Sequence, residues 1–143
     1  MKKLLPLLLI TALPLCAAAG PRPAVSVPEK APPLMAPEGK KNPLPGGGWF
    51  IWKFDKKPRL GPVIMKVRIY AKDGRQDSSL EVTGEYGMPS MRHHDSGPLK
   101  FQKNKKGDYL LPVDIAMSGE WEIAVRIRRG KNQIFRGRTL FDV

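Results

Sequence analysis

The strongest constraint on the fold is a two-residue alternation of apolar and polar side chains in the chain after residue 48. It is clearest in EWEIAVRIRR (120–129) and recurs in VIMKVRIYA (63–71), SLEVTGEY (79–86) and GDYLLPVDIAM (107–117). Successive side chains of a strand point to opposite faces, so this period is typical of antiparallel strands that bury one face. No segment shows a convincing helical period. We therefore predict an all-β protein.

Turn-forming sequences separate these segments: KDGRQDS, GMPSMRHHDSGP, KNKKGD, MSGE and RGKN. Together with the aromatic run WFIWKF (49–54) and a short strand in LKFQK (99–103), they indicate about seven strands, which fits an immunoglobulin-like two-sheet β-sandwich. Pro112 lies inside one of these strands and cannot donate a ladder hydrogen bond. Its strand is therefore predicted to be an edge strand or to carry a bulge there.

The N-terminus predicts an export signal. Two lysines precede the apolar run LLPLLLITALPL (4–15), which is shorter than the ~20 residues that span a membrane. The three alanines at 17–19, before Gly20, fit a cleavage site. We predict a signal peptide over residues 1–19 and a periplasmic or otherwise extracytoplasmic location. Lipid attachment at Cys16, the only cysteine, is the alternative, and cleavage would leave no cysteine for a disulfide or a thiolate metal site.

Residues 20–48 have a different composition. They are rich in proline, contain no aromatic residue and end in three consecutive glycines. Such a segment shows no helical or strand period and is poor in side chains that could form a core. We predict a disordered Pro/Gly-rich linker over residues 20–48 and a globular domain over residues 49–143.

The chain is strongly basic, with a formal net charge of +12. This charge favours partners with acidic groups, such as an anionic surface or an acidic protein. Because the protein is predicted to be exported, nucleic acid is not expected to be a partner. We expect an envelope protein or a copper acceptor instead, for the reason that follows.

The loop GMPSMRHHDSGP carries two methionines, Met88 and Met91, directly before His93 and His94. Thioether sulfur and imidazole nitrogen both bind copper, and thioethers favour Cu(I). A loop rich in glycine and proline can fold so that Met88, Met91 and His93 converge. We predict a copper site there, with Met117 from the MSGE turn and His94 as further candidate ligands.

Two details of this site follow from the expected local structure. An extended chain at His93 would turn His94 away from the site, because successive side chains alternate. Asp95 would then be placed to accept a hydrogen bond from a ligand histidine, as outer-shell carboxylates commonly do.

A packing role for the methionines is the main alternative. Met88 is in phase with Tyr86, and Met117 with Ile115, so either could fill a gap in the core. The domain would then be a structural or interaction module that docks on an envelope partner or an anionic surface. A Met88 sulfur buried among Tyr86 and Trp121 would favour this alternative.

A hydrolase that uses His93, His94 and Asp95 is a third hypothesis. The sequence contains no nucleophile elbow and no placed pair of carboxylates, and the nearby serines are ordinary turn residues. We therefore predict a binding module and not an enzyme.

Two stretches, GEYGMPSMRHH (84–94) and GDYLLPVDIAMSGEWEIAVRI (107–127), resemble the YtkA-like and FixH-like exported domains. In those families an M-P-x-M-x-H loop precedes a G-x-Y strand and an M-x-G-x-W turn. The matching residues here are Met88, Pro89, Met91, His93, Gly107, Tyr109, Met117, Gly119 and Trp121. The resemblance covers roughly residues 63–127. It implies an extracytoplasmic immunoglobulin-like sandwich associated with copper handling and oxidase assembly.

Overall fold

The computed structural model describes the chain from residue 30 to residue 143. The predicted signal peptide, with Cys16, and the start of the predicted linker lie outside the described residues. Residues 31–143 form one compact unit. Its elements are β1 (Asn42–Pro43), β2 (Trp49–Phe54), β3 (Gly61–Tyr70), β4 (Glu81–Gly87), the 3-10 helix η1 (Arg92–His94), β5 (Leu99–Lys100), β6 (Gln102–Lys103), β7 (Tyr109–Ile115), β8 (Glu120–Arg129) and β9 (Asn132–Asp142).

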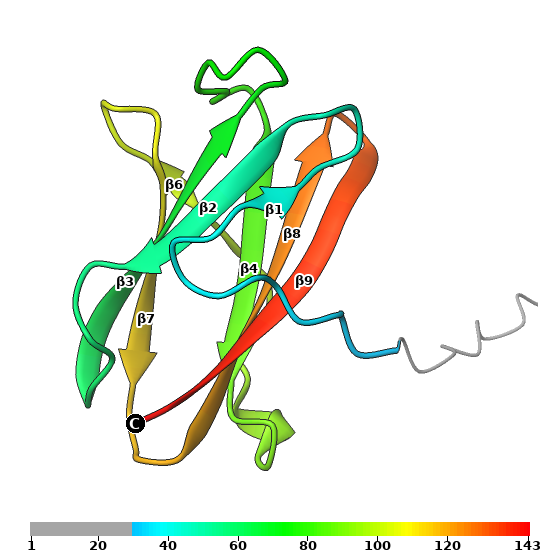
Figure 1. Cartoon of the computed structure of the whole chain (residues 1–143). Coiled ribbons are helices and arrows are strands. Elements are labelled where there is room, and N and C mark those ends of the chain that lie inside the picture. The colour runs from blue at the N-terminus through cyan, green and yellow to red at the C-terminus, as the bar shows by residue number, and fades with distance from the viewer. Residues whose placement is uncertain (1–29) are drawn as a thin grey trace, which may run out of the picture. The chain divides into compact units, whose positions relative to one another are not determined.

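The strands form two antiparallel sheets that pack face to face (Figure 1). One has the order β1-β2-β3-β7-β6 and the other β5-β4-β8-β9. In immunoglobulin nomenclature β2, β3, β7 and β6 correspond to strands A, B, E and D, and β5, β4, β8 and β9 to C′, C, F and G. The predicted all-β sandwich is therefore confirmed. No helix within residues 30–143 is long and apolar enough to cross a membrane.

The core lies between the sheets and is built from the alternating residues that the sequence pattern indicates. In β8 every second side chain is buried, from Trp121 to Ile127, while the intervening residues face outward. β7 and β3 show the same alternation. The largest fully buried side chains are Tyr109, Phe50, Met65, Ile69, Leu111, Ile115, Ile123 and Ile127. Burial of these rows in two facing sheets is the main source of stability.

The predicted short strand at 99–103 is divided between the two sheets. β5 pairs with β4 in one sheet, and β6 pairs with β7 in the other. Phe101 lies between them, is buried, and donates its backbone N–H to the carbonyl of Val82. The chain therefore crosses the sandwich at Phe101, whose ring fills the core at the crossing.

Pro112 occupies the position that its missing N–H requires. β6 covers β7 only at Tyr109 and Leu110, so β7 is an edge strand beyond them. Pro112 faces Ile64 of β3 on its other side. The predicted edge position is confirmed.

Residues 31–48 differ from the predicted disordered linker. β1 pairs with β2, and the side chains of Asn42 and Leu44 are buried. Further upstream, Leu34 forms a parallel bridge with Arg138 of β9, and the carbonyl of Ala36 accepts a 2.9 Å hydrogen bond from the indole of Trp52. The segment thus contacts the edges of both sheets, and the prediction is wrong for residues 31–48. Its order comes from hydrogen bonds to strand edges and a few buried side chains, which no sequence period reveals.

Candidate functional site

A pocket of about 300 Å³ lies at one end of the sandwich. Figure 1 shows that the C-terminus, the β4–β5 loop and the β7–β8 turn lie at this end. The β4–β5 loop with η1 forms one side, and the β7–β8 turn forms the other. We call it the Met/His pocket. Its lining includes Tyr86, Met88, Met91, His94, Met117 and Trp121. Four of the five predicted ligands thus line one cavity, and His93 is the exception.

Two successive tight turns place the ligands of the β4–β5 loop. The N–H of Met91 donates to the carbonyl of Met88 at 2.9 Å, and the N–H of His94 donates to that of Met91 at 3.0 Å. Residues three apart in such turns lie on the same side of the chain. Met88, Met91 and His94 therefore share a side, and this three-residue spacing was the sequence signal that could have identified His94.

The two histidines exchange the roles that an extended chain would give them. Residues 92–94 form η1 instead of an extended segment. His94 consequently lines the pocket, whereas His93 does not. Both histidines are exposed, and their rings lie 4.8 Å apart between centroids. The expectation that His94 points away is therefore wrong, because it assumed strand alternation through the loop.

Met88 is the most buried of the candidate ligands, with 8% of its surface exposed. It belongs to the hydrophobic core. Its methyl carbon lies so close to Gly119 that a Cβ atom added to Gly119 would be only 2.7 Å from it. Gly119 also has a φ of 135°, which disfavours any other residue. Met88 therefore forms the floor of the pocket and packs in the core at the same time.

Met117 does not continue the buried row of β7. The strand ends at Ile115, and Met117 is 43% exposed. The alternative that Met117 fills the core is therefore wrong, because the alternation stops where the turn begins. Its backbone is nevertheless fixed, since its carbonyl accepts a 2.9 Å hydrogen bond from the indole of Trp121.

Paired hydrogen bonds hold both walls of the pocket. Tyr86 and Ser96 bond reciprocally across the base of the β4–β5 loop, through the Ser96 hydroxyl and backbone groups. Gly119 and Val143 exchange two backbone hydrogen bonds of 2.9 and 3.0 Å on the opposite wall. Because both loops are tied to strand ends, the pocket is largely preformed, which reduces the cost of ordering ligands on binding.

Asp95 has a different role from the one predicted. Its carboxylate lies so close to the backbone of Gly87 that it leaves no room for a Cβ there. Asp95 thus packs the loop onto the end of β4. A second carboxylate, Asp114, lines the pocket itself. Sequence reasoning missed Asp114, although its position one residue before the end of β7 was a usable signal.

The donor set of the pocket is soft. It offers three thioethers and one imidazole, with a carboxylate and two aromatic rings nearby. No group of three His, Cys, Asp or Glu residues in the region 30–143 could hold a metal ion. A site of this composition suits Cu(I) better than zinc, calcium or magnesium, which prefer nitrogen, thiolate or oxygen ligands.

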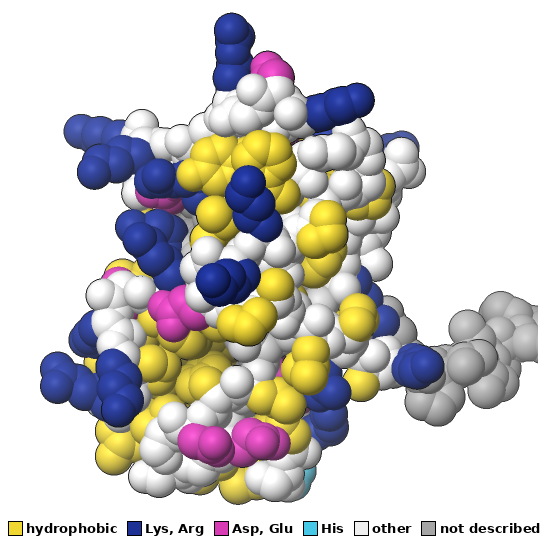
Figure 2. Space-filling view, viewed as in Figure 1, with side chains coloured by type: hydrophobic (Ala, Val, Ile, Leu, Met, Phe, Trp, Pro, Cys, Tyr) yellow, Lys and Arg dark blue, Asp and Glu magenta, His cyan; other side chains and the backbone are white. Residues whose placement is uncertain are grey.

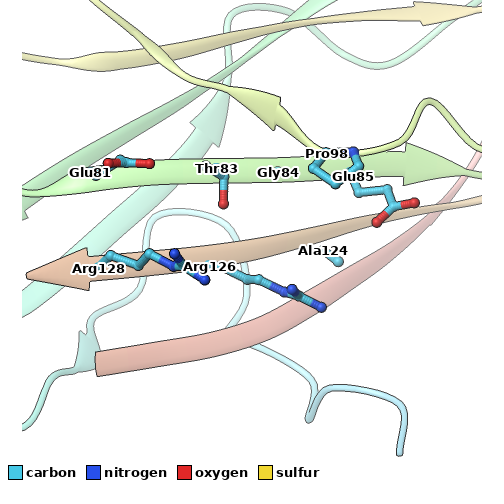
Figure 3. A pocket seen from close by; sticks show the side chains of 8 residues that line it. All are labelled: Glu81, Thr83, Gly84, Glu85, Pro98, Ala124, Arg126 and Arg128. Atoms are coloured by element: carbon cyan, nitrogen blue, oxygen red, sulfur yellow. The ribbon is translucent and has the colours of Figure 1, made fainter. Parts of the chain in front are cut away.

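A second hollow lies on the outer face of β4 and β8 (Figure 3). Figure 3 shows Thr83 between Glu81 and Glu85 on β4, with Arg128, Arg126 and Ala124 opposite them on β8. Rows of opposite charge on adjacent strands stabilise an exposed sheet face through cross-strand pairs. This hollow offers no soft ligand, so the Met/His pocket is the candidate site.

No family model matches the chain, and no curated protein matches it. One solved structure with a detectable likeness is FetP of uropathogenic E. coli strain F11, recombinantly expressed in the periplasm. The two share 13% identity over 76% of this chain and 95% of that one, with a TM-score of 0.48. A likeness at this level carries no conclusion about function, and membership of the YtkA-like or FixH-like domains stays a prediction.

Proposed function

We propose that this chain is an exported copper-binding module that holds Cu(I) in the Met/His pocket for delivery or buffering. The thioethers of Met88, Met91 and Met117 and the imidazole of His94 are the proposed ligands. The observation that carries this proposal is that these four side chains, from two separate loops, line one pocket. Soft ligands grouped in this way select Cu(I).

Packing alone accounts for Met88 but not for the whole group. Met88 is buried near Tyr86 and Trp121, as the interaction-module alternative requires. Met117, in contrast, is 43% exposed and His94 is exposed, so neither is needed to fill the core. An exposed methionine and an exposed histidine that line one pocket together with two further methionines favour metal binding over packing.

The aromatic rings and Asp114 give the pocket two further properties. The Tyr86 and Trp121 rings lie 6.4 Å apart, between centroids, and place apolar surface around the ligands. Such surroundings favour the cuprous ion, since thioethers do not compete well with water in an open site. Asp114 at the lining supplies a carboxylate that can accept a hydrogen bond from the free ring nitrogen of His94. The pocket offers no activated nucleophile, so we propose binding and not catalysis.

The test is a competition titration of Cu(I) against chelators of graded strength, under reducing conditions. Met91→Leu, Met117→Leu and His94→Ala should each lower the Cu(I) affinity by at least about tenfold. Even the loss of a residue that only hydrogen-bonds to a metal ligand typically lowers metal affinity by that factor. Met65→Leu is the matched control, because Met65 is fully buried in β3 outside the pocket. His93→Ala is the control for His94→Ala, since His93 is exposed and does not line the pocket.

The outcomes separate the two functions. If all three pocket variants bind Cu(I) like the parent, these side chains are not copper ligands and the interaction-module alternative stands. If the parent loses copper to a weak chelator, the pocket is not a copper site. If His93→Ala weakens binding more than His94→Ala, the assignment of the histidine ligand is wrong.

A further inference from the structure

We propose that a cleft between the β2–β3 loop and the end of β9, beside the Met/His pocket, docks an acidic segment of a partner protein. This partner is the protein that delivers or receives copper. The identity of this partner as a copper carrier rests on the proposed function, whereas the docking itself does not. The cleft has a volume of about 720 Å³. The β2–β3 loop forms one wall with residues 56–60, and Ser118, Asp142 and Val143 form the other.

The β2–β3 loop presents positive charge without a compensating partner. Lys56, Lys57 and Arg59 are exposed, and none of them pairs with a carboxylate within 4.0 Å among the described residues. Leu60 follows them and is 56% exposed, which places an apolar side chain beside three cations. A surface of this kind fits a partner segment that combines acidic residues with an apolar one.

The cleft and the Met/His pocket share the β7–β8 turn. Ser118 lines the cleft and directly follows Met117, which lines the pocket. The same turn is held by the two backbone hydrogen bonds between Gly119 and Val143. A partner seated in the cleft would therefore lie next to the partly exposed Met117, one of the proposed copper ligands.

The acidic residues at this end favour a protein over an anionic membrane. Asp55, Asp114, Glu120 and Asp142 lie at the ends of β2, β7, β8 and β9, and all are exposed. A flat anionic bilayer would meet these carboxylates as well as the cations. A peptide can instead place its acidic side chains on the Lys56–Arg59 wall and a backbone N–H near Asp142 across the cleft.

Total charge alone does not select this surface. Figure 2 shows Lys and Arg side chains at several separate places on the visible face, at its top, along its left side and over its middle, with hydrophobic surface between them. The β6–β7 loop provides a matched control, because Lys105 and Lys106 are also consecutive and exposed but belong to a different, more polar hollow. A docking site must distinguish the two lysine pairs, whereas simple charge attraction cannot.

The experiment is an NMR titration of the metal-free protein with the blocked peptide acetyl-Glu-Glu-Leu-Glu-Glu-amide. Chemical shift changes should concentrate at residues 56–60, Ser118 and Asp142. Lys56→Gln/Lys57→Gln should weaken peptide binding about fivefold, the effect of two solvent-exposed charge contacts, and Lys105→Gln/Lys106→Gln should change it less than about twofold. Leu60→Ser should weaken it at constant charge.

Three results would overturn the proposal: no binding of the peptide, shift changes spread over both lysine loops, or equal effects of the two double variants. Phosphatidylglycerol vesicles form a further arm, and binding to them through residues 56–60 in place of the peptide would assign the surface to a membrane.

The Cu(I) affinity of Lys56→Gln/Lys57→Gln, which leaves every proposed ligand intact, is measured in parallel. Failure of docking with normal copper binding rejects only this inference, and failure of copper binding with normal docking rejects only the proposed function.

Discussion

The indole N–H of Trp121 donates a hydrogen bond to the carbonyl oxygen of Met117, with 2.9 Å between the two atoms. Trp121 is buried in the core, as its alternation with Ile123 predicts, while Met117 is 43% exposed. The bond therefore ties an exposed candidate ligand to a side chain that is buried in the core. A ligand held in this way needs less ordering when the metal binds.

Trp121→Phe should separate this positioning role from packing. The phenyl ring keeps most of the buried apolar surface but cannot donate to Met117, so we expect a loss of about 1–2 kcal/mol in unfolding free energy. The Cu(I) affinity should also fall, by about tenfold, because the Met117 carbonyl loses the hydrogen bond that positions it, although the Gly119–Val143 hydrogen bonds remain. Chemical denaturation and Cu(I) competition measure the two effects.

Trp52→Phe is the control for this change. Trp52 is buried to a similar degree and donates an equally short hydrogen bond, to the carbonyl of Ala36, but lies outside the Met/His pocket. It should lose similar stability while its Cu(I) affinity stays within about twofold of the parent, since distant sites act independently. Equal losses of affinity in the two variants would mean that general destabilisation, and not the bond to Met117, is responsible.

Asn42→Ala tests whether residues 31–48 belong to the folded domain. The buried Asn42 accepts a 2.8 Å hydrogen bond from the N–H of Ala36, which holds the segment in place between β1 and β9. Removing the amide should lower the unfolding free energy by about 2 kcal/mol, because a partly buried donor loses its partner. Asn132→Ala, at an exposed position in β9, should have little effect in the same thermal melts.

A shortened chain that begins at Gly48 extends this test. It would lose the pairing of β1 with β2, the buried side chain of Leu44 and the acceptor of the Trp52 indole. We expect its unfolding midpoint to fall by more than about 10 °C, since each kcal/mol corresponds to several degrees in a domain of this size. An unchanged midpoint would restore the interpretation of residues 31–48 as a dispensable linker.

The strands were predictable because their side chains obey a simple geometric period. Trp121 to Ile127 and Tyr109 to Ile115 are buried in the order that alternation requires. The same rule failed where the chain leaves a strand. Strand alternation predicted that Met117 could fill the core, but β7 ends at Ile115. It also predicted that His94 points away from the pocket, but residues 92–94 form η1.

The N-terminal segment was not predictable for a different reason. Its order depends on contacts with residues far away in sequence, such as Arg138 of β9 and Trp52 of β2. Proline, glycine and isolated apolar residues give no periodic signal, so composition indicated disorder. Edge strands of a sandwich nevertheless offer unpaired backbone groups, and a nearby segment of any composition can satisfy them.

Asp108→Asn should show how far a buried ion pair stabilises the end opposite the Met/His pocket. Asp108 is buried at the start of β7 and accepts hydrogen bonds from the guanidinium of Arg68, one of 2.9 Å, and from Gln76. Hydrogen bonds from Arg68 lower the pKa of Asp108 below its ordinary value, against the opposing effect of burial. Neutralising the carboxylate should cost about 3 kcal/mol at pH 7, near the lower end for a broken buried pair because Arg68 keeps partial access to water.

The pH dependence of this loss has a defined sign. Because the pKa of Asp108 is lower in the folded protein than in the unfolded chain, the unfolded chain binds the proton more readily. The stabilisation is therefore complete above the unfolded value of about 4 and is lost as the pH falls below it. The stability difference between the parent and Asp108→Asn should be constant from pH 8 to about 5 and should shrink in more acidic buffers. Asp73→Asn is the control: Asp73 and Arg75 are both exposed and 3.8 Å apart, so this variant should change the unfolding free energy at pH 7 by less than about 1 kcal/mol. If the difference between the parent and Asp108→Asn grew as the pH fell, the carboxylate would not be stabilised by Arg68 in the folded protein.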